Sequence, residues 1–156
     1  MFSSNKKNPT FRWVNCLNGT RGQVTQFPFR LPAGSPSPQV EIQPTAQGLS
    51  LNPLPGRRLL VNGQATDSPV TIAQTSTLQL EDSLLVLSLD EADAFADVRP
   101  DAWMLFDASS GDLLGEFAPA DLLDRANELG RPPEQLACTP AGLEVGFSLS
   151  LAAPLL

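Results

Sequence analysis

Short hydrophobic runs separated by glycine and proline make up the first ninety residues of the chain. Many of these runs hold β-branched or aromatic residues, and the breaks between them leave no room for a long helix. The pattern therefore predicts an all-β arrangement for this half. The expected strands cover residues 12–17, 23–31, 39–43, 48–51, 57–61, 70–73, 77–80 and 83–89.

Two connections between these strands have a clear sequence signal. Asn62 and Gly63 follow the apolar run 59–61, and they predict a tight turn because Asn and Gly tolerate positive φ best. Ser35 and Ser37 lie in the segment Ala-Gly-Ser-Pro-Ser-Pro, which is too short for a proline-rich tract. We interpret that segment as an exposed loop that joins two strands.

The pattern changes beyond these strands. Acidic residues surround small apolar ones over 91–101, as in a linker or a short capped helix, and this stretch is the expected domain boundary. The runs 103–106 and 113–117 flank the segment 107–112, whose Ser-Ser-Gly centre predicts a hairpin. A last strand is expected over 143–149.

One helix is clear in the last part of the chain. Pro119 suits a first helical position, Gly130 suits a left-handed cap, and two prolines after it prevent continuation. Apolar residues at helical spacing mark one face of this helix. They are Leu122, Leu123, Ala126 and Leu129.

Composition adds the expectation of a globular protein that needs neither metal nor disulfides. The chain has 156 residues, of which 42% are hydrophobic, and this suffices for a core. Cys16 and Cys138 form no CxxC motif, so two unlinked buried thiols are expected. No apolar run approaches a membrane span, and no apolar signal segment follows the first polar residues. We therefore expect a cytoplasmic location.

The chain contains no histidine and no tyrosine. Because histidine is the usual proton carrier near neutral pH, Ser-His-Asp and Cys-His catalysis are excluded. Two separated cysteines also supply too few ligands for most zinc sites. Neither a dinucleotide-binding nor a phosphate-loop glycine motif is present. We expect no catalytic residue and no cofactor.

A carboxylate or metal-dependent hydrolase is the enzyme alternative. Asp107, Asp112 and Glu116 would carry it, and Ser109 adds another oxygen ligand nearby. Their spacing departs from the EF-hand pattern after its first position. An ordinary hairpin loop is the preferred interpretation.

Charge is unevenly distributed along the chain, whose formal net charge is -7. The first 60 residues hold seven basic residues and one acidic residue, whereas the rest holds three basic and 16 acidic ones. Such a chain can associate head to tail, or its basic half can meet an acidic partner. We prefer two solvated faces, because the basic residues are scattered.

Nucleic-acid binding would need these basic residues to form a stripe beside stacking aromatic rings. The candidates are Arg12, Arg21, Arg30, Arg57, Arg58, Trp13, Phe27 and Phe29. Aromatic residues at strand spacing more often belong to a core, and the overall acidity disfavours this partner. We therefore expect no nucleic acid.

The order of features over 11–90 resembles the forkhead-associated (FHA) family. Residues 17–24 look like the opening hairpin of that family, 38–42 stands where a strand follows its phosphate-reading motif, and the Val-Asn-Gly of 61–63 resembles its late turn. Residues 78–87 look like its closing hairpin. The resemblance implies a β-sandwich whose loops at one end read phosphothreonine peptides.

The phosphate-reading positions of that family differ here. Arg30 stands near the place of its Gly-Arg pair, and Ser35 and Ser37 occupy the loop of its Ser-Arg-x-x-His motif, without arginine or histidine. Arg57 and Arg58 stand where the family has Ser-x-Asn-Gly. Without arginine side chains to donate bidentate hydrogen bonds, nothing offsets the cost of removing water from a phosphate dianion. The resemblance is thus to a degenerate domain, with an anion site at Arg30, Arg57 and Arg58 as the alternative.

Residues 103–136 have a weaker resemblance to bacterial relatives of the GYF domain, in which a Trp, a Gly-Pro-Phe-like turn and a short helix form a groove for proline-rich segments. Trp103 stands at the first position, Gly115-Glu116-Phe117 at the turn, and 120–122 at the start of the helix. The resemblance implies peptide capture through Trp103 and Phe117, with simple core packing as the alternative.

These observations predict a mainly β fold, namely an FHA-like β-sandwich followed by a small α/β unit. The expected parts are a flexible N-terminus (1–10), the sandwich (11–90), a linker or short helix (91–101), the α/β unit (102–150) and a tail (151–156). The expected function is non-catalytic contact with a protein partner, with self-association as the simplest version. Candidate binding residues are Arg30, Ser35, Ser37, Arg57, Arg58, Asn62, Trp103 and Phe117.

Overall fold

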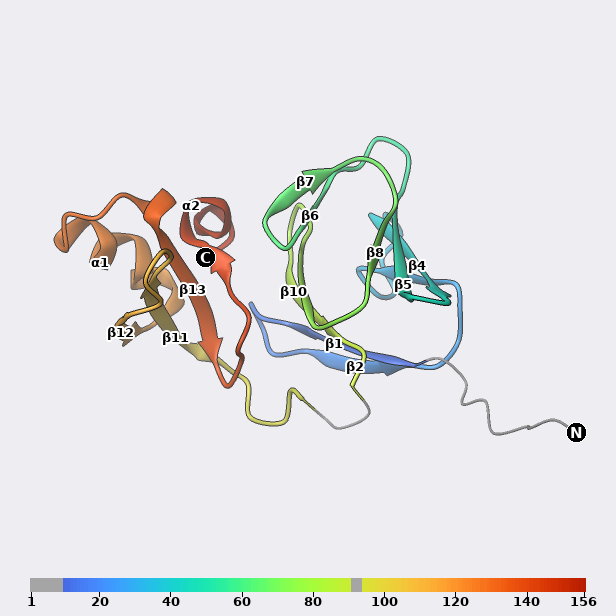
Figure 1. The fold of residues 1–156 in the computed structure, drawn as a ribbon, viewed down its shortest axis with the longest axis horizontal. Coiled ribbons are helices and arrows are strands. Elements are labelled where there is room, and N and C mark those ends of the chain that lie inside the picture. The colour runs from blue at the N-terminus through green and yellow to red at the C-terminus, as the bar shows by residue number, and fades with distance from the viewer. Residues whose placement is uncertain (1–9, 91–93) are drawn as a thin grey trace, which may run out of the picture.

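The computed structural model describes residues 10–90 and 94–156 (Figure 1). Within these ranges the chain forms 14 strands, arranged in three antiparallel sheets, and two short α-helices. The prediction of a mainly β fold is therefore confirmed. The expected flexible N-terminus falls almost entirely on residues outside the described part, as do residues 91–93 of the expected linker.

The first 90 residues form two of the sheets. The central sheet has the order β2-β1-β10-β9-β6-β7, and the outer sheet has the order β3-β4-β5-β8. The central strands are β1 (Phe11–Asn15), β2 (Arg21–Val24), β6 (Leu59–Val61), β7 (Gln64–Thr66), β9 (Ser76–Gln79) and β10 (Leu84–Ser88). The outer strands are β3 (Phe29–Leu31), β4 (Val40–Thr45), β5 (Gly48–Pro53) and β8 (Val70–Ile72).

The C-terminal sheet has the order β12-β11-β13-β14. Its strands are β11 (Arg99–Asp107), β12 (Leu113–Phe117), β13 (Leu136–Ala141) and β14 (Phe147–Ser148). A 3₁₀ turn (Pro119–Asp121) leads into α1 (Leu122–Glu128), and a second one (Pro133–Gln135) leads into β13. After β14 the chain ends in α2 (Leu149–Ala152) and a 3₁₀ turn (Ala153–Leu155).

The central sheet is the middle layer of the molecule, and β10 shows why. All five of its residues are buried. Leu85 and Leu87 belong to a core shared with the outer sheet, whereas Leu84 and Val86 belong to a second core shared with the C-terminal sheet. A strand that is buried on both faces must be apolar at successive positions, which explains the continuous run Leu-Leu-Val-Leu.

The two halves of the chain therefore pack on each other rather than lying apart (Figure 1). Val14 and Cys16 of the N-terminal half share the second core with Trp103 and Cys138 of the C-terminal half. A hydrogen bond of 2.7 Å from the Gln79 side-chain amide to the carbonyl oxygen of Leu151 adds a polar link.

The expected turn at Asn62 and Gly63 is confirmed. Both residues have positive φ, 50° and 83°, and the turn joins β6 to β7, in which Val61 pairs with Gln64. The strand β7 had no sequence signal, because Gln64–Thr66 is short and polar. It forms because the turn delivers it next to β6.

One predicted strand is wrong in extent. The stretch 23–31 was expected to be continuous, but β2 ends at Val24 and β3 begins at Phe29 in the other sheet. Pro28 lies in the break, and proline cannot donate to a ladder of hydrogen bonds. The chain crosses between the two sheets at this point.

The predicted hairpin and helix are both present, but the helix is shorter than its apolar pattern. Leu122 and Ala126 are fully buried, whereas Leu123 is 40% exposed and Leu129, beyond the last turn, is 51% exposed. Two helical turns present a single narrow buried stripe, and Leu123 lies about 100° away from it. Gly130 has φ 69° and ends the helix as expected.

The expected strand over 143–149 is largely wrong. Strand structure in this stretch is limited to Phe147–Ser148, and the chain then turns into α2. The strand beside β11 is instead β13, which contains Pro140 and Thr139 and has a weak strand signal. Ala152, within the expected tail, has an exposed fraction of 0%.

Candidate binding surface at one end of the sandwich

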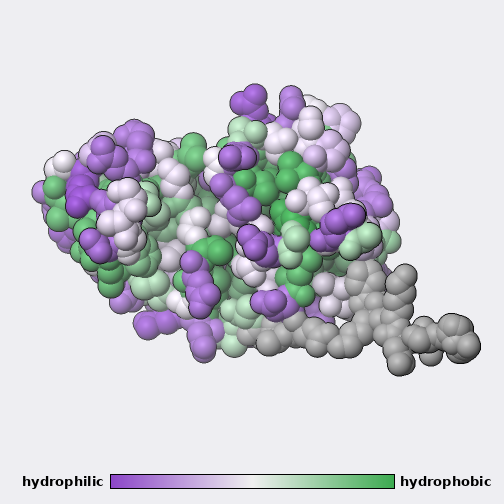
Figure 2. All heavy atoms as spheres, in the orientation of Figure 1, coloured by the Kyte–Doolittle hydropathy of each residue, from purple (hydrophilic) through white to green (hydrophobic). Residues whose placement is uncertain are grey.

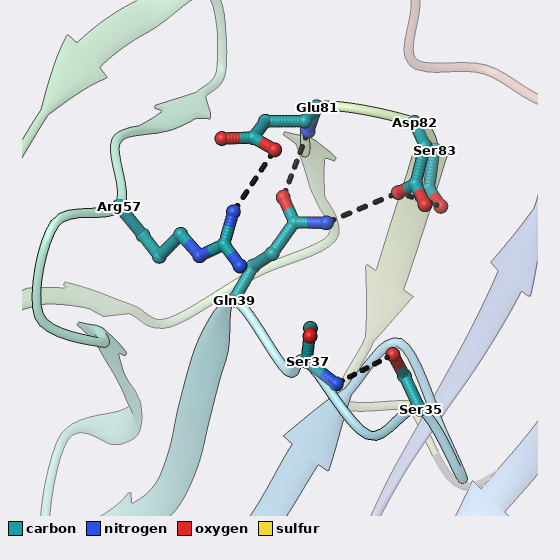
Figure 3. A network of polar contacts seen from close by, with 7 residues as sticks. All are labelled: Ser35, Ser37, Gln39, Arg57, Glu81, Asp82 and Ser83. Carbon is teal, nitrogen blue, oxygen red and sulfur yellow. Dashed lines mark hydrogen bonds and ion pairs between the residues drawn. The ribbon is translucent and has the colours of Figure 1, made fainter.

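Three loops meet at one end of the sandwich, and we call them together the loop end. They are residues 32–39, 54–58 and 81–83. Val40 of β4 pairs with Pro53 of β5, so the loop before β4 and the loop after β5 leave the outer sheet on the same side. The turn 81–83 joins β9 to β10 of the central sheet. Figure 3 shows how the side chains of the three loops face one another.

The side chain of Gln39 connects the two sheets at the loop end (Figure 3). It is 4% exposed. Its oxygen accepts a hydrogen bond of 2.8 Å from the backbone N–H of Glu81, and its amide nitrogen donates one of 3.1 Å to Oδ1 of Asp82. Its backbone carbonyl accepts from the N–H of Leu54 at 3.0 Å. Gln39 thus connects its own loop to the other two, to residues 81–83 through its side chain and to residues 54–58 through its backbone carbonyl.

Charges at the loop end are balanced. Arg57 donates to the carboxylate of Glu81 at 3.0 Å, and the pair is partly open to solvent. Arg58 is exposed, and Asp82 lies beside Glu81. The three loops therefore carry two arginines and two acids, which leaves no net positive charge. An exposed ion pair of this kind contributes about 0–1 kcal/mol.

The two loop serines were expected as binding residues. The Ser35 hydroxyl oxygen accepts a hydrogen bond of 3.1 Å from the backbone N–H of Ser37, and the N–H of Ser35 donates to the carbonyl of Pro32. These contacts hold the loop in a local turn. The side chain of Ser37 is exposed at the tip.

An open groove of about 520 Å³ runs beside the loop end. Residues 53–58 and Asp67 line it. Its charged lining residues are Arg57, Arg58 and Asp67, and the guanidinium of Arg57 is paired with Glu81. It offers hydrogen bonds and mixed charge rather than a positive pocket.

Arg30 lies outside the loops, in the middle of β3. Its guanidinium donates to the carboxylate of Glu41 across the β3–β4 pair at 3.2 Å. Arg30 and Arg57 are thus each paired with a separate carboxylate. The anion alternative required these arginines to converge with free charge, and the pairing does not supply it.

Asn62, another expected binding residue, is exposed at the opposite end of β6 from Arg58 and does not join the loop end. Its side-chain oxygen accepts from the N–H of Thr77 at 3.0 Å, and its amide nitrogen donates to the hydroxyl of Ser76 at 3.3 Å. The side chain therefore serves the packing of β6 against β9.

The expected peptide groove at Trp103 is also wrong. Trp103 is 0% exposed, its indole N–H donates to the carbonyl of Pro100 at 3.0 Å, and its ring packs near that of Phe147. Phe117 is partly covered, and the guanidinium of Arg125 lies 5.8 Å from its ring centre. Trp103 has no face open to a ligand.

The carboxylate loop after β11 is satisfied internally. Oδ1 of Asp107 accepts from the backbone N–H groups of Ser109 and Ser110, both at 2.9 Å, and from the Ser109 hydroxyl at 2.7 Å. Its other oxygen pairs with Arg131. The hydrogen bonds, first that from the Ser110 N–H, hold the pKa of Asp107 far below its ordinary value. One carboxylate oxygen is thus engaged by the turn and the other by Arg131.

Within residues 10–90 and 94–156, no group of three or more His, Cys, Asp or Glu side chains is placed to hold a metal ion. Asp112 and Glu116, which the hydrolase alternative required beside Asp107, are exposed. The geometry does not support that alternative.

The two thiols are free and buried, as the sequence predicted. Burial raises the pKa of Cys138 to about 12. Burial, with Cys138 nearby, raises the pKa of Cys16 still further. Both thiols therefore stay protonated at neutral pH and are poor nucleophiles.

Sequence reasoning missed Gln39, Glu81 and Asp82 as members of the loop end. Their signal was faint: a glutamine at the start of a strand and an acidic pair in a short turn. Nothing in the chain itself indicates that residues 42 and 43 positions apart meet. Hydrophilic residues are otherwise spread over the visible face of both halves rather than gathered in one patch (Figure 2).

Comparison with family models, with curated proteins and with solved structures finds no match to this chain. Among the described helices, none has the length and apolar content that crossing a membrane requires.

Proposed function

We propose that this chain is a non-catalytic protein-interaction module. In this proposal residues 11–90 are an FHA-like sandwich whose loop end contacts a protein partner and does not bind phosphothreonine. The C-terminal unit packs on the face of the central sheet opposite the outer sheet and supports the sandwich. Two opposed antiparallel sheets, the positive-φ turn at Asn62 and Gly63, and loops gathered at one end support the likeness.

The charge balance at the loop end is the observation that carries the proposal. Arg57 is already paired with Glu81, and Asp82 adds a second carboxylate beside it. A phosphate dianion brought there would meet two negative groups and would have to break an existing pair. An uncharged or mixed-charge protein surface meets no such cost.

The state of the candidate reactive groups in the described residues supports a non-catalytic role. The chain has no histidine, its thiols are buried and protonated, and the Asp107 carboxylate is engaged by its own turn and by Arg131. Exposed loops on a rigid sandwich are a common type of protein-binding surface. The proposal includes a cytoplasmic location, for which two unlinked thiols are the support.

The test is photo-cross-linking in cells of the native host, because the three loops contain no lysine for amine-directed reagents. A photoreactive amino acid is placed in turn at exposed positions of the three loops and of the C-terminal half, and mass spectrometry identifies the linked peptides. We expect cross-links from residues 32–39, 54–58 and 81–83 to a recurrent protein, which includes a second copy if the chain self-associates. Arg58→Ala should reduce recovery several-fold because Arg58 is exposed at this end. Arg99→Ala, an exposed arginine of the other half, is the matched control and should leave recovery unchanged.

A phosphothreonine peptide library provides the opposing test. Saturable binding that Arg57→Ala and Arg58→Ala both abolish would show a phosphopeptide reader and overturn the proposal. Cross-links confined to the C-terminal half would overturn the assignment to the loop end.

A further inference from the structure

A second hollow, distinct from the groove at Arg58, opens on the flank of the loop end. It has a volume of about 350 Å³ and is open to solvent on one side. Its walls come from β1, from the turn before β2, from the end of β3 and from the start of β10. Its lining includes Trp13, Leu31, Pro32, Ala33, Ser83 and Leu85.

The hollow shares walls with the loop end. Pro32 and Ala33 begin the loop 32–39, and Ser83 ends the turn 81–83. A protein that contacts the loop end is therefore within reach of this opening.

Trp13 supplies the largest wall, and its position depends on a glycine. Trp13 pairs with Gly22 across β1 and β2, and a Cβ on Gly22 would lie 2.8 Å from the indole nitrogen. The missing side chain lets the ring lie against the backbone of the edge strand. A partly exposed tryptophan beside a hollow is the type of residue that dominates binding energy at protein interfaces.

The lining contains no ionisable side chain. The accessible apolar surface comes from Trp13, Pro32 and Ala33, because Leu31 and Leu85 are only 1% and 2% exposed. Neutral amides and hydroxyls complete the lining. A charged group placed here would lose its hydration without gaining a counter-charge, whereas an apolar side chain gains from leaving water. The electrostatics thus select an uncharged occupant.

We propose that this hollow, the Trp13 pocket, is an anchor site for one uncharged apolar side chain, such as leucine, on an extended segment of the partner protein. This inference deepens the proposed function and rests on the loop end being the contact surface. A protein segment fits better than a free small molecule, because an open hollow does not bury most of a ligand's surface. A single side chain of a partner protein does not need to be fully enclosed by the hollow, because the rest of the partner makes further contacts with the loops.

The chain's two tryptophans allow a direct test. Trp103 is fully buried, so 5-fluorotryptophan labelling gives one reporter at the pocket and one internal reference for fluorine NMR. The probe is the blocked peptide acetyl-Gly-Leu-Gly-amide. We expect it to shift the Trp13 resonance saturably, with a dissociation constant on the order of millimolar because a single side chain is anchored, and to leave the Trp103 resonance in place.

Matched peptides and variants complete the design. The same peptide with Glu or Lys at its centre should bind at least about tenfold more weakly, since the lining offers no counter-charge. Ala33→Phe fills the hollow from its rim and should abolish the shift. Ala46→Phe, an exposed alanine on the turn between β4 and β5, should not.

No shift at Trp13, equal binding of the charged peptides, or binding that survives Ala33→Phe would each overturn the anchor site. These failures are distinguishable from failure of the proposed function. If the peptide does not shift the Trp13 resonance but cross-links at the loop end persist, the anchor site is refuted and the proposed contact surface stands. If the cross-links lie elsewhere on the chain, both the anchor site and the loop-end contact surface are refuted.

Discussion

The side chain of Gln39 donates a hydrogen bond of 3.1 Å to the carboxylate of Asp82, 43 positions later in the chain. The same side chain accepts from the N–H of Glu81, so the two sheets are joined at the end that we assign to binding. Because Gln39 is 4% exposed, water does not readily replace it.

Gln39→Ala should therefore destabilise the fold by about 1–2 kcal/mol, because the Glu81 N–H loses its partner in a partly buried position. Urea unfolding followed by circular dichroism measures this. Gln43→Ala, an exposed glutamine on β4, the strand that follows Gln39, should stay within about 0.5 kcal/mol of wild type. Equal effects of the two substitutions would show that the hydrogen bonds of the Gln39 side chain add no specific stability.

The alternation along β10 predicts that its two faces stabilise different layers. Leu84→Ala and Leu87→Ala each create a cavity at a fully buried position, and each should cost about 2–5 kcal/mol. Hydrogen exchange should rise in β11 and β13 for Leu84→Ala but in β4 and β5 for Leu87→Ala, because the two side chains lie in separate cores. The same exchange pattern for both would refute the layered arrangement.

The depressed pKa of Asp107 predicts an acid-labile contribution to stability. Its folded pKa lies below its unfolded value of about 3.9, so the contribution is complete above that pH and is lost as pH falls through the folded pKa. The midpoint of thermal unfolding should thus drop more steeply for wild type than for Asp107→Asn below about pH 4. Asp112→Asn, on the same loop, should keep the wild-type slope.

Gly22→Ala is predicted to displace the Trp13 ring, since the new Cβ would lie 2.8 Å from the indole nitrogen. Trp13 fluorescence should shift, and binding of the leucine peptide should fall at least about tenfold if the ring forms the pocket wall. Gly34→Ala is an instructive comparison. Its Cβ meets nothing within 4 Å, so any effect there reflects the positive φ of 71° and should leave Trp13 fluorescence unchanged.

The buried thiols predict slow modification. Cys16 and Cys138 are protonated and lie inside the second core. A thiol-specific disulfide reagent at pH 8 should therefore label them only as fast as the core opens by local unfolding, and not at the intrinsic rate of the thiol reaction. Both should react at once in concentrated urea. Rapid labelling of either thiol in native protein would contradict the packing described for the two halves.

Local chemistry in the sequence determined much of the fold. The asparagine and glycine at 62 and 63 tolerate positive φ better than other residues, Gly130 ends α1, and the apolar runs separated by breaks become short strands. The absence of histidine likewise removed whole classes of catalysis before any contact was known. Such features act within a few residues, so they can be read directly from the chain.

The tertiary structure decided which faces are buried and which distant groups meet. Nothing local distinguishes Trp13, which stays partly open beside Gly22, from Trp103, which is sealed in the core. Polar β7 and proline-containing β13 become strands because a neighbouring strand offers them hydrogen bonds. Burial and pairing depend on the sum of contacts between segments far apart in sequence, and local propensity is weaker than that sum.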